Sequence, residues 1–359
     1  MRFLFVLQIP PPFHGVSLMN QILLDYAKKI NISFTHVPIN AAKSVDSIGR
    51  FGVDKLICSL KVAYKIFTLR EKYTISYFAL SIRGYAFYRD FLFILIAKIL
   101  KKKVILHLHG TGFKKRTVID RFTLKIMFRN AYIIQHSLLL KSDIEYLSYK
   151  RVFYLPNGIP DTFSKYRNTP KLNAKKNINI IFLSNLFEFK GCFVLLEAIN
   201  RLKNTQKSSR YHFIGNWESL KTKKRFLDYI DVHEISSFIG EIGPKYNKEK
   251  FDFLQKMDIL VFPTLYEAFG NVALEAMMFE IPVIATDEGS LLEIIDDYKT
   301  GFIVPKGDVY ELANKIDILS KNHELRKAMG IEGRKRYLQY FTLETYQHNI
   351  HNILSKVNN

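Results

Sequence analysis

Short apolar runs alternate with longer helical patterns along the chain, and this alternation limits the possible folds more than any other feature. It indicates β-α-β units around parallel sheets, because strands covered by helices on both faces are apolar on both sides. The predicted strands of the first half are Arg2–Ile9, Ile32–Pro38, Thr74–Ala79, Val104–His109, Ala131–Gln135 and Val152–Leu155, and the helices include Leu18–Lys29 and Tyr88–Lys101. Those of the second half are Ile178–Leu183, Tyr211–Ile214, Ser236–Ile239, Ile259–Pro263, Val283–Ala285 and Phe302–Val304.

The length of 359 residues exceeds what one hydrophobic core usually serves, so two domains are expected. Polar residues and lysines interrupt the apolar pattern over residues 165–176, as in a linker. We predict an α/β protein of two facing, doubly wound, Rossmann-like domains, residues 1–167 and 168–341. Such sheets bind ligands beyond the carboxyl ends of their strands, which places the expected site in a cleft between the domains.

The last stretch, residues 342–359, is predicted to form a separate helix. Thr342 is a plausible N-cap, and one apolar stripe follows it at helical spacing, formed by Leu343, Tyr346, Ile350, Ile353 and Val357. The stripe must pack on a partner, and a return to the first domain is one option.

The net charge of +20 is concentrated in the first half of the chain. Residues 1–165 hold 26 Lys and Arg against 9 Asp and Glu, whereas residues 166–359 hold 27 against 24. This asymmetry indicates an anionic partner, although a solvated basic surface without a partner is the alternative. The basic residues gather between Arg83 and Lys125, among Phe and Leu, without a nucleic-acid-binding motif. An anionic membrane surface therefore suits them better than nucleic acid.

Several classes of protein are excluded or disfavoured. The two cysteines, Cys58 and Cys192, are far apart and form no C-x-x-C pair, so a disulfide framework is excluded and a cysteine zinc site is disfavoured. Both cysteines are expected to be buried as small apolar residues. No apolar run approaches the ~18–20 residues that span a bilayer. The run Phe3–Ile9 ends in prolines without a cleavage site, so it is read as a strand and not a signal peptide. We expect a cytoplasmic protein, with a peripheral place at the inner face of the membrane left open.

The strongest motif is Pro263–Met277, PTLYEAFGNVALEAM. A strand ends at Pro263, and a helix is predicted from near Gly270 to about Phe279, so its first amides can hold a phosphate. Glu267 and Glu275 bracket that position. They are too far apart for a glycosidase pair, since eight helical residues span ~12 Å, but they suit hydroxyls on two parts of one ligand. The alternative is a solvated Glu267 and a structural Glu275.

Three further loops follow predicted strands. Lys190-Gly191 opens a helix after Phe182–Leu183, where a lysine can neutralise a diphosphate, although a plain surface lysine is the alternative. Gly15, in PPPFHGVS, precedes a helix, where backbone amides can hold a phosphate or simply form a tight turn. His109 ends the strand before Gly110-Thr111-Gly112, a fragment too short for a dinucleotide fingerprint. His107 lies on the same face, and a core histidine is the alternative.

The second half resembles family 4 of the retaining glycosyltransferases, which have the GT-B fold. The resemblance rests on the E-x7-E signature, read from Glu267–Met277 as E-x-F-G-x-x-x-L-E-A-M, and on the succeeding strand Ile281–Thr286. Glu288–Glu293 resembles the family's G-G-x-x-E turn, with its first Gly replaced, and Gly301–Val304 resembles the next strand. Pro156–Ile159 resembles the P-N-G-I hinge segment, in which we expect Gly158 at positive φ.

The resemblance implies a role for each motif. Glu275 would bind the donor ribose, Glu267 the donor sugar, and backbone amides of Phe269, Gly270, Asn271 and Val272 the sugar and diphosphate. Lys190 would bind the diphosphate, with Asn185 in place of the family's usual Arg. From the first domain, Gly15 would close over the diphosphate and His109 would face the reacting end of the sugar.

The expected function is therefore transfer of a sugar from a nucleoside diphosphate sugar to a glycan or lipid-linked acceptor. No D-x-D or His/Asp cluster in the sequence indicates a required metal, and the resemblance implies none, so we expect neither a metal nor another cofactor. Assembly of bacterial surface polysaccharide or lipid-linked oligosaccharide is the expected setting. The alternatives are a sugar-nucleotide epimerase of similar architecture and a non-catalytic basic protein that binds membranes or nucleic acid.

Overall fold

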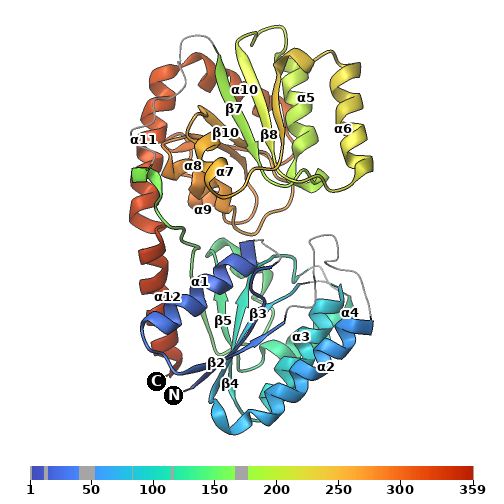
Figure 1. The fold of residues 1–359 in the computed structure, drawn as a ribbon, viewed down its shortest axis with the longest axis vertical. Helices are drawn as coiled ribbons and strands as arrows, with labels where there is room; N and C mark the ends of the chain where they lie inside the picture. The colour runs from blue at the N-terminus through green and yellow to red at the C-terminus, as the bar shows by residue number, and fades with distance from the viewer. Residues whose placement is uncertain are drawn as a thin grey trace. The chain divides into compact units, whose positions relative to one another are not determined.

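The computed structural model describes residues 2–11, 15–39, 53–82, 84–114, 117–165 and 177–358. These residues fall into two compact units. Unit 1 comprises residues 1–157 and 346–359, and unit 2 comprises residues 158–345. The chain therefore passes between the units twice, and each unit is described separately below (Figure 1).

Unit 1 is built on a parallel six-stranded sheet with the strand order β2-β1-β3-β4-β5-β6. Because β1 pairs with both β2 and β3, the strand order reverses there, and a doubly wound sheet opens its ligand crevice at such a point. The strands are β1 (Phe3–Leu7), β2 (Phe34–Pro38), β3 (Ile75–Leu80), β4 (Lys103–Leu108), β5 (Tyr132–Gln135) and β6 (Arg151–Tyr154).

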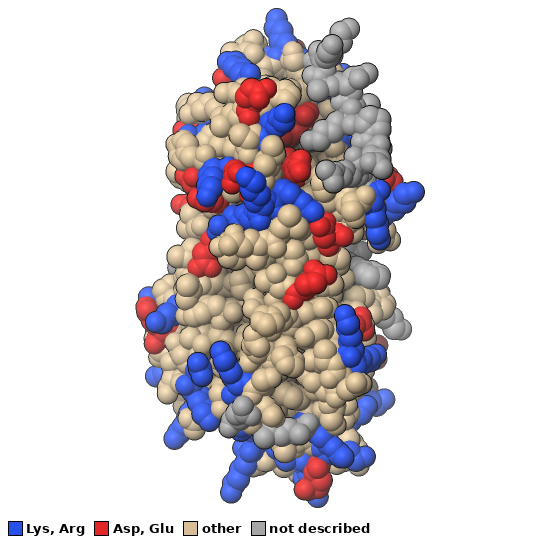
Figure 2. All heavy atoms as spheres, turned by 90° about the vertical axis from the view of Figure 1, so that its left-hand side faces the viewer, with Lys and Arg blue, Asp and Glu red and all other residues tan. Residues whose placement is uncertain are grey.

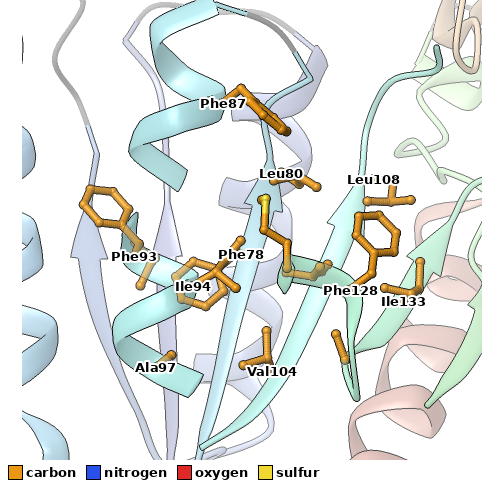
Figure 3. Close-up of a cluster of buried hydrophobic side chains, with 14 of the residues drawn as sticks. Phe78, Leu80, Phe87, Phe93, Ile94, Ala97, Val104, Leu108, Phe128 and Ile133 are labelled. Carbon is orange, nitrogen blue, oxygen red and sulfur yellow. The ribbon is translucent and has the colours of Figure 1, made fainter. Parts of the chain in front are cut away.

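Helices cover both faces of the unit 1 sheet (Figure 1). One face carries α2 (Val53–Thr68), α3 (Gly84–Ile99) and α4 (Val118–Phe128), while α1 (Gly15–Lys29) and α12 (Leu343–Asn358) lie on the other. Figure 3 shows the packing on the first face, where buried side chains of α3 and α4 meet those of β3, β4 and β5. Phe87, Phe93 and Phe128 are among the largest fully buried side chains.

Residues 346–358 of α12 belong to unit 1, although they come from the far end of the chain. Thr342 caps the helix, since its Oγ1 accepts the Thr345 N–H at 3.2 Å, which confirms the predicted N-cap. Of the predicted stripe, Leu343 is half-buried and the other four residues are buried, together with Leu354. Lys103 Nζ donates to the carbonyls of Val357 at 2.9 Å and Asn358 at 3.1 Å, which ties the start of β4 to the end of the helix.

Unit 2 has a second parallel six-stranded sheet, with the order β12-β11-β10-β7-β8-β9 and its reversal at β7. Its strands are β7 (Ile178–Leu183), β8 (Ser209–Ile214), β9 (Ile239–Gly243), β10 (Ile259–Phe262), β11 (Val283–Thr286) and β12 (Gly301–Val304). Its helices are α5 (Cys192–Leu202), α6 (Leu220–Val232), α7 (Asn247–Leu254), α8 (Asn271–Met278), α9 (Leu291–Ile294), α10 (Val309–Lys321) and α11 (His323–Tyr340). Buried apolar clusters lie on both faces of this sheet.

Eleven of the twelve predicted strands overlap observed ones over most of their length, which confirms the α/β class. The twelfth, Ser236–Ile239, is wrong: Ser236–Phe238 form a 3₁₀ turn, and β9 begins at Ile239. The apolar residues of that stretch, Phe238 and Ile239, pack against a buried apolar cluster of unit 2 without forming a strand over its whole length. The predicted linker lies almost entirely within residues 166–176, outside the described residues.

The hinge segment and one cysteine also differ from expectation. Gly158 does not have a positive φ; its neighbour Ile159 pairs with Thr342 instead of following a left-handed turn. The Ile159 N–H donates to Phe341 O at 3.0 Å, and its carbonyl accepts from Leu343 N at 2.9 Å. Cys192 is buried as predicted, whereas Cys58 on α2 is only half-buried.

Candidate functional site

The two predicted loops of unit 2 meet at the reversal of its sheet, because β7 and β10 are neighbours. Lys190 follows β7 and Glu267 follows β10. Their side chains form an ion pair, with 2.8 Å between Lys190 Nζ and Glu267 Oε2, and both are mostly buried. The Leu265 N–H also donates to Phe189 O at 2.8 Å. The ammonium of Lys190 and the carboxylate of Glu267 therefore lie side by side at the carboxyl edge of the unit 2 sheet.

Gly191 permits this close approach of the two loops. Its φ is +83°, and a Cβ built on it would lie 1.9 Å from the carbonyl oxygen of Pro263 at the end of β10. Any larger residue would push the Lys190 loop away from β10. Gly191 also precedes α5, so this glycine sets both the helix start and the position of the lysine.

Glu267 is fixed at the entrance to α8. Its Oε1 accepts the N–H groups of Ala268 at 3.0 Å and Phe269 at 3.3 Å. Gly270 then takes φ +98° as the residue before α8, which confirms the predicted helix to within a residue at each end. A Cβ on Gly289 would lie 2.2 Å from Glu267 O, so the turn resembling G-G-x-x-E packs directly against the Glu267 loop.

The backbone expected to hold a diphosphate is only partly available in this arrangement. The Phe269 N–H already donates to Glu267, and the Phe269 side chain is 4% exposed and belongs to the apolar core. Gly270, Asn271 and Val272 form the junction with α8, where the first amides of a helix lack intrahelical acceptors. The Phe269 N–H is therefore already engaged, and the binding of a diphosphate by the amides from Gly270 onward stays a prediction.

Glu275 lies one helical turn further along α8 and is 15% exposed. Its Oε1 accepts from Lys250 Nζ of α7 at 2.7 Å. Its Oε2 is buried and has no hydrogen-bond partner among the residues that the structure describes. A buried carboxylate oxygen without a donor is costly, and a ligand hydroxyl would satisfy it. The sequence reading missed Lys250, because a lysine in the lysine-rich stretch 245–250 carries no local signal.

Asn185 supports a neighbouring loop. Its Oδ1 accepts the Asn216 N–H at 3.3 Å, and Asn216 Oδ1 accepts from the Tyr246 hydroxyl at 2.8 Å. A Cβ on Gly215 would lie 1.9 Å from Ser184 O, so the loops after β7 and β8 are in tight contact. The side-chain oxygen of Asn185 thus has a structural partner within unit 2.

In unit 1, His109 and the start of α1 flank a cavity at the sheet reversal. The cavity has a volume of about 170 Å³ and lies beyond the ends of β1, β3 and β4; its lining includes Gln8, Val16, Asn20, Arg89, His109 and Gly110. Gly15 is the first residue of α1 and is exposed, while residues 12–14 of its motif lie outside the described residues. His109 therefore faces a crevice of the type in which doubly wound sheets bind ligands.

His109 belongs to a cluster of three histidines, with His107 and His136. His107 is 1% exposed and lies 2.5 Å from the Tyr77 hydroxyl through Nδ1, and burial, reinforced by the other two histidines, holds the pKa of His107 well below 6.5. The sequence places His107 on the same strand face as His109, but it gives no indication of His136. This third histidine follows a different strand, with a whole helix between it and the other two in the sequence, so no local spacing reveals the cluster.

The surface of unit 1 combines cations with exposed apolar side chains. On α4, Val118, Ile119 and Phe122 are 84%, 70% and 66% exposed, beside exposed Arg121 and Lys125. On α2, five large apolar residues are also exposed, to 42–71%: Leu56, Ile57, Leu60, Tyr64 and Phe67. On the face that Figure 2 shows, unit 1 in the lower part carries mainly Lys and Arg with fewer Asp and Glu, whereas unit 2 shows both signs of charge intermixed. Among the described residues, no helix is long and apolar enough to cross a membrane.

Comparison with known proteins identifies the family of the second half. Residues 164–336 match the family of glycosyl transferases group 1. The capsular polysaccharide biosynthesis glycosyltransferase CapM of Staphylococcus aureus is 30% identical over 193 residues, which are 52% of this chain and 49% of the relative. The chain spans about half to two thirds of the length of the curated relatives it matches.

Solved structures match the chain over nearly its full length. Sucrose-phosphate synthase from Thermosynechococcus elongatus superposes with a TM-score of 0.80 at 16% identity, covering 99% of this chain and 98% of that one. Anabaena HepE in complex with UDP and glucose gives 0.74 at 18% identity, covering 99% of both chains. The chain therefore has the GT-B fold of two Rossmann-like domains, and its residues 164–336, just under half of the chain, match the glycosyl transferases group 1 family.

Proposed function

We propose that the chain is a retaining glycosyltransferase, which moves a sugar from a nucleoside diphosphate sugar to a glycan or lipid-linked acceptor. The observation that carries the proposal is the carboxylate of Glu275, with one oxygen on Lys250 and the other buried without a donor in the described chain. It lies one helical turn from a helix start that is flanked by Lys190 and Glu267. A nucleoside diphosphate sugar matches these groups in order. Its ribose hydroxyls can donate to Glu275, its diphosphate can bind the helix start and Lys190, and its sugar hydroxyls can donate to Glu267.

In this proposal the diphosphate accumulates negative charge as the sugar leaves. The amides at the start of α8 and the Lys190 ammonium stabilise that charge, in a site positioned before the reaction begins. Glu267 accepts hydroxyls of the sugar with the carboxylate oxygen that now pairs with Lys190, so the ion pair loosens as Lys190 turns to the phosphates. The charge stabilisation comes from protein groups alone, and the proposal includes no metal or other cofactor. Roles for Gly15 and His109 on the same donor stay predictions.

The setting and the donor are proposed from relatives. CapM is named for capsular polysaccharide biosynthesis, and WcaL of Escherichia coli, 23% identical over 234 residues, is named as a putative glycosyltransferase of colanic acid biosynthesis. HepE has been solved with UDP-glucose. We therefore infer a UDP-sugar donor and a role in surface polysaccharide assembly for this chain.

The first test is thermal unfolding of the purified chain with UDP, GDP and ADP, because a ligand that binds the folded state raises its apparent stability. We expect stabilisation by one of the three. Glu267→Ala should then reduce sugar transfer by a factor of 100 or more in a chain that stays folded, with an unfolding midpoint lowered by the loss of its ion pair to Lys190 and of two backbone hydrogen bonds. Glu332→Ala, which removes an ion-paired glutamate of α11, is the matched control and should transfer normally. Normal transfer by Glu267→Ala would refute its role.

The epimerase alternative predicts a different product from the same donor. Incubation with the donor alone would then yield an isomerised sugar nucleotide, detectable by chromatography or NMR. A transferase leaves the configuration of the donor sugar unchanged and needs the acceptor for rapid turnover.

The peripheral membrane contact is also a proposal, placed on α4 of unit 1. Three exposed apolar side chains beside Arg121 and Lys125 match the apolar interior and the negative headgroups of an anionic leaflet, with each cation contributing about 1 kcal/mol. Such contact would bring unit 1 to a lipid-linked acceptor at the cytoplasmic face. Binding to vesicles that contain phosphatidylglycerol should fall with salt and fall further in Ile119→Asp/Phe122→Asp. Equal sedimentation of this variant and the wild type would contradict the placement.

A further inference from the structure

The three histidines of unit 1 are arranged as metal ligands on two neighbouring strands. His107 and His109 are two residues apart on β4 and just beyond it, so their side chains share one face of the sheet. His136 directly follows β5, which pairs with β4 up to Leu108 and Gln135. The ring centroids of His107 and His109 lie 3.9 Å apart, and those of His136 lie 5.2 and 5.0 Å from them.

The ring nitrogens are close to the spacing that a metal requires. One nitrogen from each of the three rings lies within 4.8 Å of the other two. Zinc bonds of about 2.0–2.1 Å in a tetrahedron place two nitrogens about 3.3 Å apart. Closing the cluster around an ion therefore needs movements of about 1 Å.

Two of the rings have outer partners of the kind that orient metal ligands. Nδ1 of His107 lies 2.5 Å from Tyr77 Oη, and Nδ1 of His136 lies 3.3 Å from Leu155 O. When Nδ1 carries the proton, Nε2 offers a lone pair, and such hydrogen bonds fix the tautomer and the ring orientation. Nε2 of His107 is buried and has no hydrogen-bond partner in the described part of the chain. In the tautomer in which Nδ1–H donates to Tyr77 Oη, this Nε2 carries a lone pair that a metal can take.

The ligand type and the charges around the cluster also suit a bound cation. Imidazole nitrogens are the ligands that Zn²⁺ takes most readily besides thiolates, and all three residues of the cluster supply them. Among the described residues that line the cavity beside His109, the other ionisable side chain is Arg89, which forms an ion pair with Asp90 at 2.7 Å. The cavity of about 170 Å³ can hold water or an anion as a further ligand, because His109 is in its lining.

From this geometry we infer that His107, His109 and His136 form a binding site for a transition metal of the Zn²⁺ type, with an open coordination position toward the cavity. A metal ion at this site regulates sugar transfer and takes no part in the transfer step itself. A bound ion occupies the His109 ring and withholds it from the sugar, so Zn²⁺ inhibits transfer. The inhibition rests on the proposed function, whereas the binding of metal does not.

Metal binding is measured on the full chain after treatment with EDTA and dialysis. Co²⁺ should give the intense visible absorbance of a tetrahedral site at one equivalent per chain, and Zn²⁺ should displace it. His107→Gln and His136→Gln should each weaken Zn²⁺ binding at least about 100-fold, measured by competition with a chromogenic chelator. Urea unfolding without metal verifies that each variant is folded; if one is not, the other is used.

The control removes the other histidine pair of the same unit. His348 and His351 are exposed on α12 at a spacing that puts them on one helix face, where a pair can bind metal at the surface. His348→Gln/His351→Gln should bind Zn²⁺ as the wild type does. Binding that is lost in this variant and kept in His136→Gln would overturn the inference, as would the absence of Zn²⁺ binding by the wild type.

The same variants separate this inference from the proposed function. Stabilisation by UDP is measured in the absence of metal and does not depend on the cluster. Zn²⁺ binding without any nucleotide effect would leave the metal site standing and remove the proposed function. Where transfer is observed, Zn²⁺ should inhibit the wild type at least 10-fold more strongly than His136→Gln. Equal inhibition would refute the control role.

Discussion

Replacing Glu275 by Gln should weaken nucleotide binding strongly while changing the fold little. The side chain is mostly buried, at 15% exposure, and Gln has nearly the same shape. The substitution removes the negative charge and turns one oxygen into an NH₂ group, which cannot accept a hydrogen bond. A hydrogen bond to a charged group contributes about 1.5–3 kcal/mol, so the Kd for the preferred nucleoside diphosphate should rise about 10- to 150-fold.

Two features of the structure set this range. Oε2 has no partner in the described chain, so a ligand hydroxyl gains its full interaction with that oxygen. Lys250, at 24% exposure, faces a neutral amide oxygen in the variant in place of the carboxylate oxygen at 2.7 Å, and the weaker pair costs stability whether or not ligand is present. That second cost appears in urea unfolding of the free protein and can be subtracted from the effect on binding.

Isothermal titration with UDP, or with whichever nucleotide stabilises the wild type, measures the change in Kd. Glu249→Gln on α7 is the matched control, because this glutamate pairs with Lys245 at 2.9 Å and is 64% exposed. It should bind nucleotide with the affinity of the wild type. A Kd for Glu275→Gln within threefold of the wild type would refute the assignment of its buried oxygen to the ligand.

Two further predictions concern stability. Gly191→Ala should destabilise unit 2 by about 2–5 kcal/mol in urea unfolding, because φ at this position is +83° and the new Cβ would lie 1.9 Å from the Pro263 carbonyl oxygen. A loss of stability below about 0.5 kcal/mol would contradict the packing described. Burial lowers the pKa of His212 to about 4, so its contribution to stability is present above pH 6.5 and is lost as the pH falls toward 4. After allowance for partial exposure, stability should drop by about 1 kcal/mol from this residue between pH 7 and 5. His212→Gln should make the pH dependence shallower, and an unchanged dependence would count against the burial.

The architecture was predictable because strands buried on both faces carry a strong signal. β7 matched its predicted range at both ends, and α8 was recognised from the Gly270 turn and the Ala-rich run that follows it. β9 was misplaced because none of its residues is fully buried and its sequence, IGEIG, has little apolar content. The signal is strong where both faces of a strand are covered and weak at the edge of a sheet.

The site was predictable only where its residues are close in sequence. Glu267 and Glu275 share one motif, so their placement on either side of a helix start followed from the spacing. Lys250 and His136 reach their partners, Glu275 and His109, only through the way helices and strands pack and pair. A single sequence contains no information on such contacts until the order of the strands is known.

Because unit 1 includes residues from both ends of the chain, it cannot finish folding during synthesis until α12 has been made. Residues 1–157 leave the ribosome early, yet the surface that receives Tyr346, Ile350 and Val357 stays uncovered until the last helix is made. During that interval unit 2 can fold, while unit 1 presents an apolar patch to chaperones. A chain that ends at Thr345 should therefore aggregate or be degraded, even though every group assigned to the donor is still present.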